Sequence, residues 1–443
     1  MTDGVKVGGS FASHLIRVTD TWPGRPVGEI MVSTSLRILP GLALVALAAG
    51  TAGAGFTIRD LGPAPGASGT AGEAINALGQ VAGRSTLNGS PVSAIRTSGQ
   101  GGFAAVTLPS YAGAAAGFGI NSQGDVAGQF VDKRDGLIHG FVTSAGGASE
   151  LGPLSVAGIK GGSTRAGGIN DAGEVVGTGS IAGRMVDGVF RSGTTQTAFR
   201  AVSSGAATII NPLGNGLYNM GSGINAAGTV VGTSETAPGG FLHAFLATRG
   251  GAASDLLSRN SAGIFGLNTY GAAINDRGDV AGSGDVGGFR HAFLASHEGG
   301  ALQDLGVIGN ANSSIARGLN SLSHVVGELD DPAGRSHAFL YDPRGGLGMI
   351  DLNTLLAPSD QSDWTLISAA AINDNDQITG VGIHDGLLRG FLLTPAADPS
   401  VVDVVGPALV PAPPASVLAA IGLGIVAAGA RLRRGRTGVR GAA

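Results

Sequence analysis

The 443-residue chain contains no cysteine, which excludes disulfide bonds, thiolate zinc sites, iron–sulfur clusters and a cysteine nucleophile. Charged residues are scarce as well, at 13% of the chain against a usual share of about 25%. Glycine is abundant instead, with 80 residues, but it lacks the three-residue period of collagen. The sequence therefore informs on architecture and cellular address more than on a reaction.

The formal net charge of −4 is unevenly distributed along the chain. Residues 55–410 contain 18 Lys+Arg and 28 Asp+Glu, a balance of −10, whereas residues 431–440 contain five arginines and no acid. Phosphate contacts need a clustered basic face, so an acidic body with a basic tail argues against nucleic acid as a partner.

The N-terminal region has the organisation of a secretory signal peptide over residues 31–54. From Met31 a short charged segment precedes an apolar run of about a dozen residues and an Ala-x-Ala cleavage sequence formed by Ala52 and Ala54. Residues 1–30 are polar and patternless, which predicts a misassigned upstream segment and Met31 as the true start. A cytosolic extension ahead of a membrane anchor is the alternative.

The C-terminal region predicts a transmembrane helix. Residues 397–414 form a Pro-rich linker, and residues 415–430 form an almost wholly apolar run that would be about 24 Å long as a helix. The arginine-rich end behind it would stay cytoplasmic under the positive-inside rule, which leaves the body outside. We therefore expect a protein exported across the inner membrane, held in the cell envelope or released outside it.

This layout resembles the PEP-CTERM sorting tail of Gram-negative exported proteins. The residues that carry the resemblance are Val410, Pro411, Ala412, Pro413, Arg433 and Arg434. The resemblance implies that an exosortase-like sorting enzyme, a membrane transpeptidase linked to exopolysaccharide secretion, reads and cleaves the tail. Ala412 departs from the family, which usually has glutamate there. A plain C-terminal anchor over residues 415–443 is the alternative.

The body, residues 55–396, is one motif used seven times. Its core is Ile-Asn, two residues, Gly, one residue, Val, one residue, Gly, with two weaker copies at the end. The repeated asparagines are Asn76, Asn121, Asn170, Asn225, Asn275, Asn320 and Asn373. A period of about 50 residues is typical of propellers, solenoids and related arrays.

Two further motifs recur in phase with the first. A His-Ala-Phe-Leu segment trails each copy, clearest at 243–246, 291–294 and 337–340 and diverged at 93–95, 139–141, 188–190 and 389–391. An Asp-Leu-Gly segment recurs at 60–62, 150–152, 255–256, 304–306 and 351–352, with degenerate copies predicted near Thr107-Leu108 and Arg200-Ala201. Each repeat is thus interpreted as four short strands joined by tight Asn/Asp–Gly turns.

Four strands per repeat predict an all-β, seven-bladed β-propeller of four-stranded blades. The Asp-Leu-Gly strand at 56–62 precedes any Ile-Asn motif, while the last repeat ends at the strand 390–394. Joining the two strands completes a seventh blade and hides both free edges. A β-solenoid is the alternative architecture.

The paired Ile-Asn…Gly-x-Val-x-Gly and His-Ala-Phe motifs resemble the HAF-type extracellular repeat family of bacteria. The likeness covers residues 56–395. Members are exported repeat proteins that often carry a PEP-CTERM tail, and the resemblance implies no defined activity.

Side chains with chemical potential have structural explanations in this pattern. The equivalent histidines of four repeats are expected to pack or hydrogen-bond within their own blades, not to form a metal ring; they are His139, His243, His291 and His337. Three others are predicted to be surface residues, namely His297, His324 and His384. The acidic turns at 275–279 and 373–376 are explained by turn formation, with calcium as the alternative. Trp364 is placed either on an exposed rim that binds sugar or in blade packing.

Three hypotheses of function remain. The first is an exported, envelope- or matrix-associated, non-enzymatic repeat protein that binds or scaffolds exopolysaccharide or surface proteins. The second is a propeller enzyme acting on extracellular polysaccharide, for which the clustered carboxylates are Asp330, Asp331, Asp360 and Asp363. The third is a protein-binding subunit of a surface assembly. No catalytic, cofactor or metal residue is assigned, and the long loops at 196–220 and 352–366 are where a site is expected.

Overall fold

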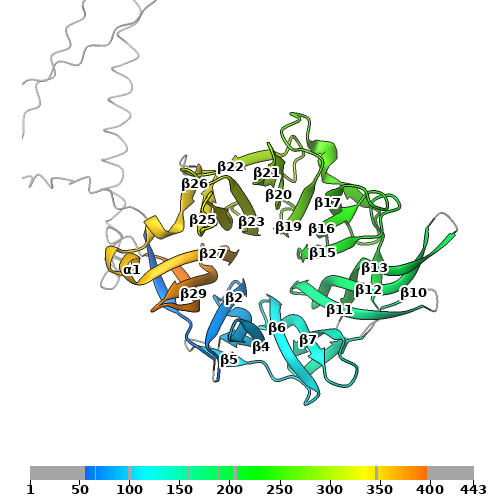
Figure 1. The fold of residues 1–443 in the computed structure, drawn as a ribbon, viewed down its shortest axis with the longest axis horizontal. Coiled ribbons are helices and arrows are strands. Elements are labelled where there is room, and N and C mark those ends of the chain that lie inside the picture. The colour runs from blue at the N-terminus through cyan, green and yellow to red at the C-terminus, as the bar shows by residue number, and fades with distance from the viewer. Residues whose placement is uncertain are drawn as a thin grey trace, which may run out of the picture. The chain divides into compact units, whose positions relative to one another are not determined.

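Short antiparallel strands form seven sheets, and Figure 1 shows them arranged around a common axis. The computed structural model describes residues 55–64, 66–97, 102–152, 154–156, 159–186, 189–202, 207–344 and 348–396. The predicted seven-bladed propeller is therefore confirmed. In each blade the inner strand ends at the Ile-Asn motif, and the next two strands follow it in chain order.

The bounds of the first three blades are as follows. Blade 1 contains β2 (Gly69–Ile75), β3 (Val81–Leu87), β4 (Ser90–Thr97) and β5 (Phe103–Ala105). Blade 2 contains β6 (Ala112–Ile120), β7 (Val126–Asp132), β8 (Ile138–Ser144) and β9 (Gly147–Leu151). Blade 3 contains β10 (Ser155–Val156), β11 (Ile159–Ile169), β12 (Glu174–Val186), β13 (Val189–Val202) and β14 (Thr208–Ile210). Blade 3 thus has a fifth strand, β10, beside its inner strand.

The other four blades have four strands each. Blade 4 contains β15 (Asn219–Ile224), β16 (Val230–Glu235), β17 (Leu242–Ala247) and β18 (Ala253–Asp255), followed by a 3-10 helix η1 (Leu256–Arg259). Blade 5 contains β19 (Thr269–Ile274), β20 (Val280–Val286), β21 (Phe289–Ala295) and β22 (Gln303–Gly306). Blade 6 contains β23 (Ser313–Leu319), β24 (Val325–Asp330), β25 (Ser336–Asp342) and β26 (Gly348–Asp351). Blade 7 follows η2 (Leu352–Leu355) and α1 (Pro358–Asp363) and contains β27 (Trp364–Ile372), β28 (Ile378–His384), β29 (Leu387–Pro395) and β1 (Phe56–Asp60).

Blade 7 closes the ring with a strand from the other end of the described chain. β1 pairs antiparallel with β29, from Phe56 opposite Pro395 to Asp60 opposite Phe391. This pairing is the closure that the leftover Asp-Leu-Gly strand predicts. It removes the open edge that β29 would otherwise present to other chains.

The phenylalanine of the His-Ala-Phe motif packs against the second glycine of the Ile-Asn motif. In blade 4, Phe245 is fully buried opposite Gly232. A Cβ on Gly232 would lie 2.0 Å from the Met220 carbonyl oxygen and 2.7 Å from the Phe245 ring. Every blade has this pair, with isoleucine as its large member in blade 1: Gly83–Ile95, Gly128–Phe141, Gly177–Phe199, Gly232–Phe245, Gly282–Phe293, Gly327–Phe339 and Gly380–Phe391. The glycine lets the inner strand approach while the ring fills the blade core.

Three motif assignments are wrong in the diverged blades. In blade 3 the Phe partner of Gly177 is Phe199, not Phe190, because the β12–β13 hairpin is longer than its counterparts. The degenerate Asp-Leu-Gly strands lie at β5 and β14, where Ala105 and Ile209 hold the aspartate position, not at Thr107-Leu108 and Arg200-Ala201. Without an aspartate, sequence pattern alone did not fix their register.

The predicted address segments lie outside the described residues. They include the cleavage residues Ala52 and Ala54, the sorting residues Val410, Pro411, Ala412, Pro413, Arg433 and Arg434, and the apolar run 415–430. In the part of the chain that is described, no helix has the length and apolar character needed to cross a membrane.

Candidate functional site

The motif asparagine organises the turn that ends each inner strand. In blade 1, Asn76 Oδ1 accepts hydrogen bonds from the backbone N–H groups of Leu78 at 3.1 Å and Gln80 at 2.9 Å. Gly79 closes this turn with a φ of 73°. In the two weaker copies, Ser323 and Asp376 take that left-handed conformation instead, with φ of 65° and 55°. The turn therefore forms even where glycine has been lost.

The same asparagines join neighbouring blades. Each of six donates from Nδ2 to the backbone carbonyl of the asparagine in the next blade, at 2.9–3.1 Å: Asn76 to Asn121, Asn170 to Asn225, Asn225 to Asn275, Asn275 to Asn320, Asn320 to Asn373 and Asn373 to Asn76. Between blades 2 and 3 the Ser122 amide donates to Asp171 at 2.8 Å. We call the seven motif asparagines the asparagine ring; its bonds join six of the seven pairs of neighbouring blades, including the pair at the ring closure.

The acidic turns at 275–279 and 373–376 belong to this network. Asp279 accepts hydrogen bonds from several donors, among them Asn275 at 2.9 Å and Ser323 at 3.0 Å. Burial raises its pKa, but the hydrogen bonds from His297 and the other donors outweigh that effect and hold the pKa of Asp279 well below its usual range. Asp374 accepts from the Ser321 amide of the preceding blade at 2.8 Å. Protein donors use these oxygens, so turn formation and blade joining explain both sequences.

The His-Ala-Phe histidines each pair with the carboxylate of the outer strand in their own blade, as expected. The Nδ1–carboxylate distances are 2.5 Å for His139–Glu150, 2.7 Å for His243–Asp255, 3.1 Å for His291–Asp304 and 2.9 Å for His337–Asp351. The aspartate also orders the turn after it; Asp255, for example, accepts from the Leu257 amide at 2.8 Å. The pair therefore ties the outer strand to its blade.

Of the other three histidines, which are predicted to be surface residues, His297 is exposed, whereas His324 and His384 are partly buried, and all three have carboxylate partners. His297 and His324 lie 2.6 Å from Asp279 and Asp376, respectively, and His384 lies 3.0 Å from Asp60. His384 also stacks on Trp364, with ring centroids 4.4 Å apart. Their partners come from distant segments of the chain, which is why local sequence gave no sign of them.

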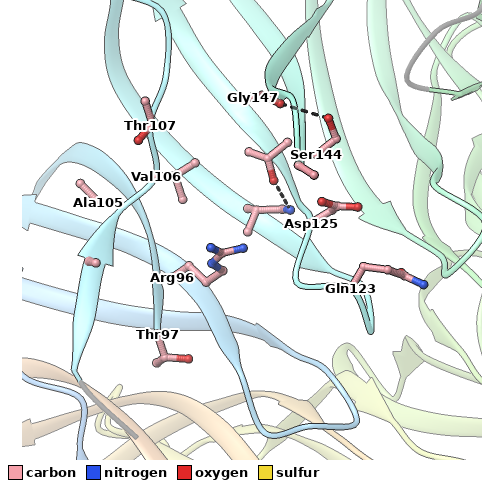
Figure 2. Close-up of a pocket in the computed structure, with 13 residues that line it drawn as sticks. Arg96, Thr97, Ala105, Val106, Thr107, Gln123, Asp125, Ser144 and Gly147 are labelled. Atoms are coloured by element: carbon pink, nitrogen blue, oxygen red, sulfur yellow. Dashed lines mark hydrogen bonds between the residues drawn. The ribbon is translucent and has the colours of Figure 1, made fainter. Parts of the chain in front are cut away.

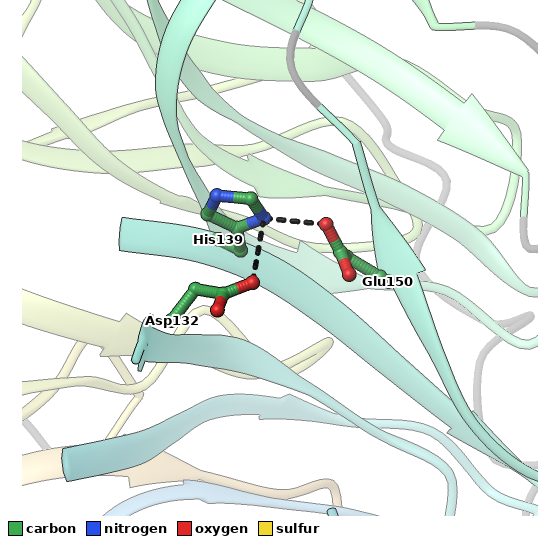
Figure 3. Close-up of side chains that lie close together, drawn as sticks. All are labelled: Asp132, His139 and Glu150. Atoms are coloured by element: carbon green, nitrogen blue, oxygen red, sulfur yellow. Dashed lines mark hydrogen bonds and ion pairs between the residues drawn. The ribbon is translucent and has the colours of Figure 1, made fainter. Parts of the chain in front are cut away.

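Blade 2 carries a denser cluster around its histidine (Figure 3). Ligand atoms of Asp132, His139 and Glu150 all lie within 4.8 Å of one another, a set that suits a divalent metal. Arg134 already pairs with both carboxylates, with Glu150 at 3.1 Å, and this pairing holds the pKa of Asp132 below its usual range. The guanidinium therefore serves as the counter-ion of this cluster, and a metal would have to displace it.

A groove of about 700 Å³ lies between blades 1 and 2 (Figure 2). Most of its wall is made of small, uncharged residues such as Ala105 and Gly147. Its guanidinium, on Arg96, donates to the Gly124 carbonyl of the neighbouring turn. The groove therefore offers a ligand no free cation, because Arg96 is used to join two blades, and its one carboxylate, on Asp125, accepts a hydrogen bond from Asn121.

The propeller axis has a different character. Each inner strand carries a β-bulge at the same place, seen as a register shift around one residue. These seven bulge residues are Glu73, Phe118, Gly167, Ser222, Ala272, Arg317 and Ala370, and all of them line one axial cavity of about 230 Å³. A bulge re-aims a side chain, here toward the axis.

One end of the axis opens into a second cavity of about 550 Å³, which we call the channel mouth. It is lined by several bulge residues together with Gln129, Arg165, Thr178, Gln196 and Met220. Arg165 lies five residues before Asn170 on an extended strand, about 15 Å away, so the mouth is at the opposite end of the propeller from the asparagine ring.

Charge at the channel mouth is positive although the body is acidic. Arg84 pairs with Glu73, and Arg317 pairs with Glu328 at 2.6 Å. Burial, and then the neighbouring guanidinium of Arg317, lower the pKa of Arg84 from its usual value. Arg165 is exposed, and no described residue forms an ion pair or hydrogen bond with its guanidinium. The mouth therefore holds one guanidinium more than its carboxylates neutralise.

The predicted site residues lie elsewhere. Trp364 is 6% exposed and packs at the start of β27 against His384, so the rim alternative is wrong and the packing alternative is confirmed. Asp330 accepts from Ser336 and Asp331 from Arg335 in one hairpin, while Asp360 and Asp363 lie on α1. None of these four carboxylates lines the axial cavity or the mouth. The expected loop at 196–220 contains the end of β13 (196–202), β14 (208–210) and a connection to β15, and its residues Gln196 and Met220 line the mouth.

Sequence analysis missed the bulge residues. Each stands two positions before the isoleucine or leucine of the Ile-Asn motif, so the repeat alignment contains this column. The column differs from blade to blade, and a search for recurring residues passes over it. The variability of this column within an otherwise regular repeat was the sequence signal that could have identified the bulge residues.

No protein-family model matches this chain, and no curated protein matches it. Among solved structures, a puromycin hydrolase matches with a TM-score of 0.44 and 16% identity, over 72% of this chain and 50% of that one. The β-propeller domain of the Trilobed protease from Pyrococcus furiosus matches with a TM-score of 0.41 and 10% identity, over 74% and 96%. TolB from Acinetobacter baumannii matches with a TM-score of 0.35 and 11% identity, over 61% and 63%. The chain spans about half the length of the puromycin hydrolase, and its fold rests on its own strand pairing.

Proposed function

We propose that this chain is an exported, non-enzymatic propeller that binds a component of the cell envelope or extracellular matrix at its channel mouth. One observation carries the proposal. Positions that build the blades recur around the ring, whereas the bulge column, which lines the axis, holds acidic, aromatic, small and basic residues. Positions that differ from blade to blade and line one cavity can form a ligand site without altering the residues that build the blades.

The proposed cellular location is inferred from the sequence. The signal-peptide organisation at 31–54 and the tail resembling PEP-CTERM at 410–443 both support export with the propeller outside the inner membrane. The HAF-type resemblance of the repeats supports an extracellular setting. An exosortase-like sorting enzyme is the partner that the tail implies, and exopolysaccharide or surface proteins are the partners that the setting implies.

Fractionation and matrix binding test the two halves of this proposal. The full chain is expressed in a Gram-negative host with an exosortase and followed with an antibody against the propeller. We expect it in the envelope or medium, and we expect a chain without residues 31–54 to stay in the cytosol. Cytosolic retention of the full chain would contradict the export half.

Binding is measured by co-sedimentation with the host's extracellular polysaccharide and surface-protein fractions. We expect the double variant Phe118→Ala with Gln129→Ala to lose most of the bound protein, because both side chains line the mouth. Phe289→Ala is the matched control, since this phenylalanine is 49% exposed on β21 outside the mouth. Equal binding by both variants would place any ligand elsewhere.

A further inference from the structure

The channel mouth has chemical features that select among ligands. Arg165 offers a guanidinium that has no partner among the described residues, and such a fork matches the two oxygens of a carboxylate. Gln129 Oε1 is buried and has no hydrogen-bond partner among the described residues. A buried amide in this state is stabilised by a ligand that donates to it, such as a hydroxyl group.

The other walls of the mouth fit the same ligand. Phe118 provides the aromatic surface, and Met220 provides a flexible apolar one. Thr178, Gln196 and Ser222 supply uncharged polar side chains around them. The cavity volume of about 550 Å³ lies within the usual range of small-ligand sites, about 300–1,000 Å³.

We infer that the channel mouth binds a carboxylate-bearing sugar, a uronic acid residue of an acidic polysaccharide. This inference rests on the proposed function and names its ligand class. Arg165 pairs with the carboxylate, Gln129 accepts from a ring hydroxyl, and Phe118 packs against the apolar face of the ring. The surplus positive charge sits inside a body of net charge −10, so an anion is drawn to the mouth and not to the surrounding surface.

An acidic peptide is the competing ligand, because it also carries carboxylates. The sugar is favoured since the mouth places one guanidinium beside several neutral hydrogen-bonding side chains, which suit the hydroxyl groups that a uronic acid carries next to its carboxylate and that a glutamate side chain lacks. Arg84 and Arg317 add no further cation for a ligand, because Glu73 and Glu328 already pair with them.

The test uses the purified full chain in detergent and isothermal titration with three probes. They are trigalacturonate, its fully methyl-esterified form, which keeps the rings and removes the charge, and triglutamate. We expect trigalacturonate to bind, its ester to bind at least about tenfold more weakly, and triglutamate not to bind. Binding should weaken with added salt.

Substitutions of Arg165 test whether its guanidinium binds the carboxylate of trigalacturonate. Arg165→Ala should weaken trigalacturonate binding by about tenfold to a hundredfold, and Arg165→Lys should give an intermediate loss, because it keeps the charge without the fork. Arg335→Ala, which removes an exposed guanidinium paired with Asp331 in a hairpin, should bind as the parent does.

Each contrary outcome has a distinct meaning. Equal binding of trigalacturonate and its ester, unaffected by Arg165→Ala, overturns the acidic-sugar assignment and leaves the proposed function standing. Arg165-dependent binding of triglutamate overturns it in favour of a polypeptide ligand. Failure to bind these probes and also the host's polysaccharide and surface-protein fractions overturns the proposed function itself.

Discussion

The two ends of the propeller axis are built from the same seven inner strands and yet follow opposite rules. At one end, the asparagine ring repeats one side chain in every blade, and six hydrogen bonds of the same kind join blade to blade. Toward the other end, the bulge column holds acidic, aromatic, small, hydroxyl-bearing and basic residues. The distance between an Asn turn and its bulge residue is three positions in the chain.

This contrast separates two tasks within one repeat. The asparagine satisfies buried backbone groups in its own turn and in the neighbouring blade, and a buried polar group left without its partner is destabilising. The bulge residue faces a cavity and satisfies no backbone group of another blade. Substitutions at the two ends should therefore affect stability and binding in opposite proportion.

The largest effect is expected where the ring closes. A chain that begins at residue 63 lacks β1, which leaves β29 with an open edge and removes the partner of His384 at Asp60. We expect loss of cooperative thermal unfolding together with aggregation, measured by calorimetry and light scattering. The matched control begins at residue 55 and retains β1. If both chains melt alike, the closure would not hold the ring.

The asparagine ring is expected to give the next largest effect. Asn275→Ala removes the bond to the Asn320 carbonyl at 3.0 Å and the turn bonds to Asp279, all of them buried. The free energy of unfolding should fall by about 2–4 kcal/mol, since partners are left unsatisfied. Urea denaturation measures this, and Asn310→Ala, at an exposed loop position, should change it by less than about 0.5 kcal/mol.

Much of the fold was open to prediction because its stabilising groups recur. Gly232 and Phe245 repeat as a pair in phase with Asn225, so strand number, blade number and closure all follow from spacing. Register was lost where the motif had decayed, as at Phe199, since a longer hairpin shifts the residue without changing its core position. The channel mouth stayed hidden because a bulge, which pattern alone does not reveal, decides where Arg317 and its equivalents point.

The joint between blades 6 and 7 should give a smaller, pH-dependent effect. The hydrogen bond with Asp376 raises the pKa of His324, so the folded state holds its proton more tightly than the unfolded state does. Stability from this pair is therefore fully present below the unfolded pKa of about 6.5 and is lost as the pH rises through the raised folded value. We expect His324→Gln to flatten the fall in stability between about pH 6 and pH 9.

The measurement is urea denaturation at several pH values in that range, where the carboxylates stay ionised. Across this pH range the free energy of unfolding of the parent chain should fall by on the order of 1 kcal/mol more than that of the variant, because one hydrogen bond to a charged group is lost. His337→Gln is the comparison variant, because its histidine is 38% exposed and pairs within a single blade. If the free energy of unfolding of the parent and of His324→Gln depends on pH in the same way, the His324–Asp376 pair does not contribute pH-dependent stability.

The smallest effect on stability is expected at the bulge column itself. Ser222→Ala and Ala370→Ser exchange a hydroxyl and a hydrogen atom within the axial cavity and leave the hydrogen bonds of the asparagine ring in place. Their free energies of unfolding should stay within about 0.5 kcal/mol of the parent, measured by the same urea titration. A loss above about 1.5 kcal/mol at either position would show that the column supports the ring, and the contrast between the two ends would fail. If the losses stay small, the column can be rewritten for a new ligand while the asparagine ring keeps the blades together.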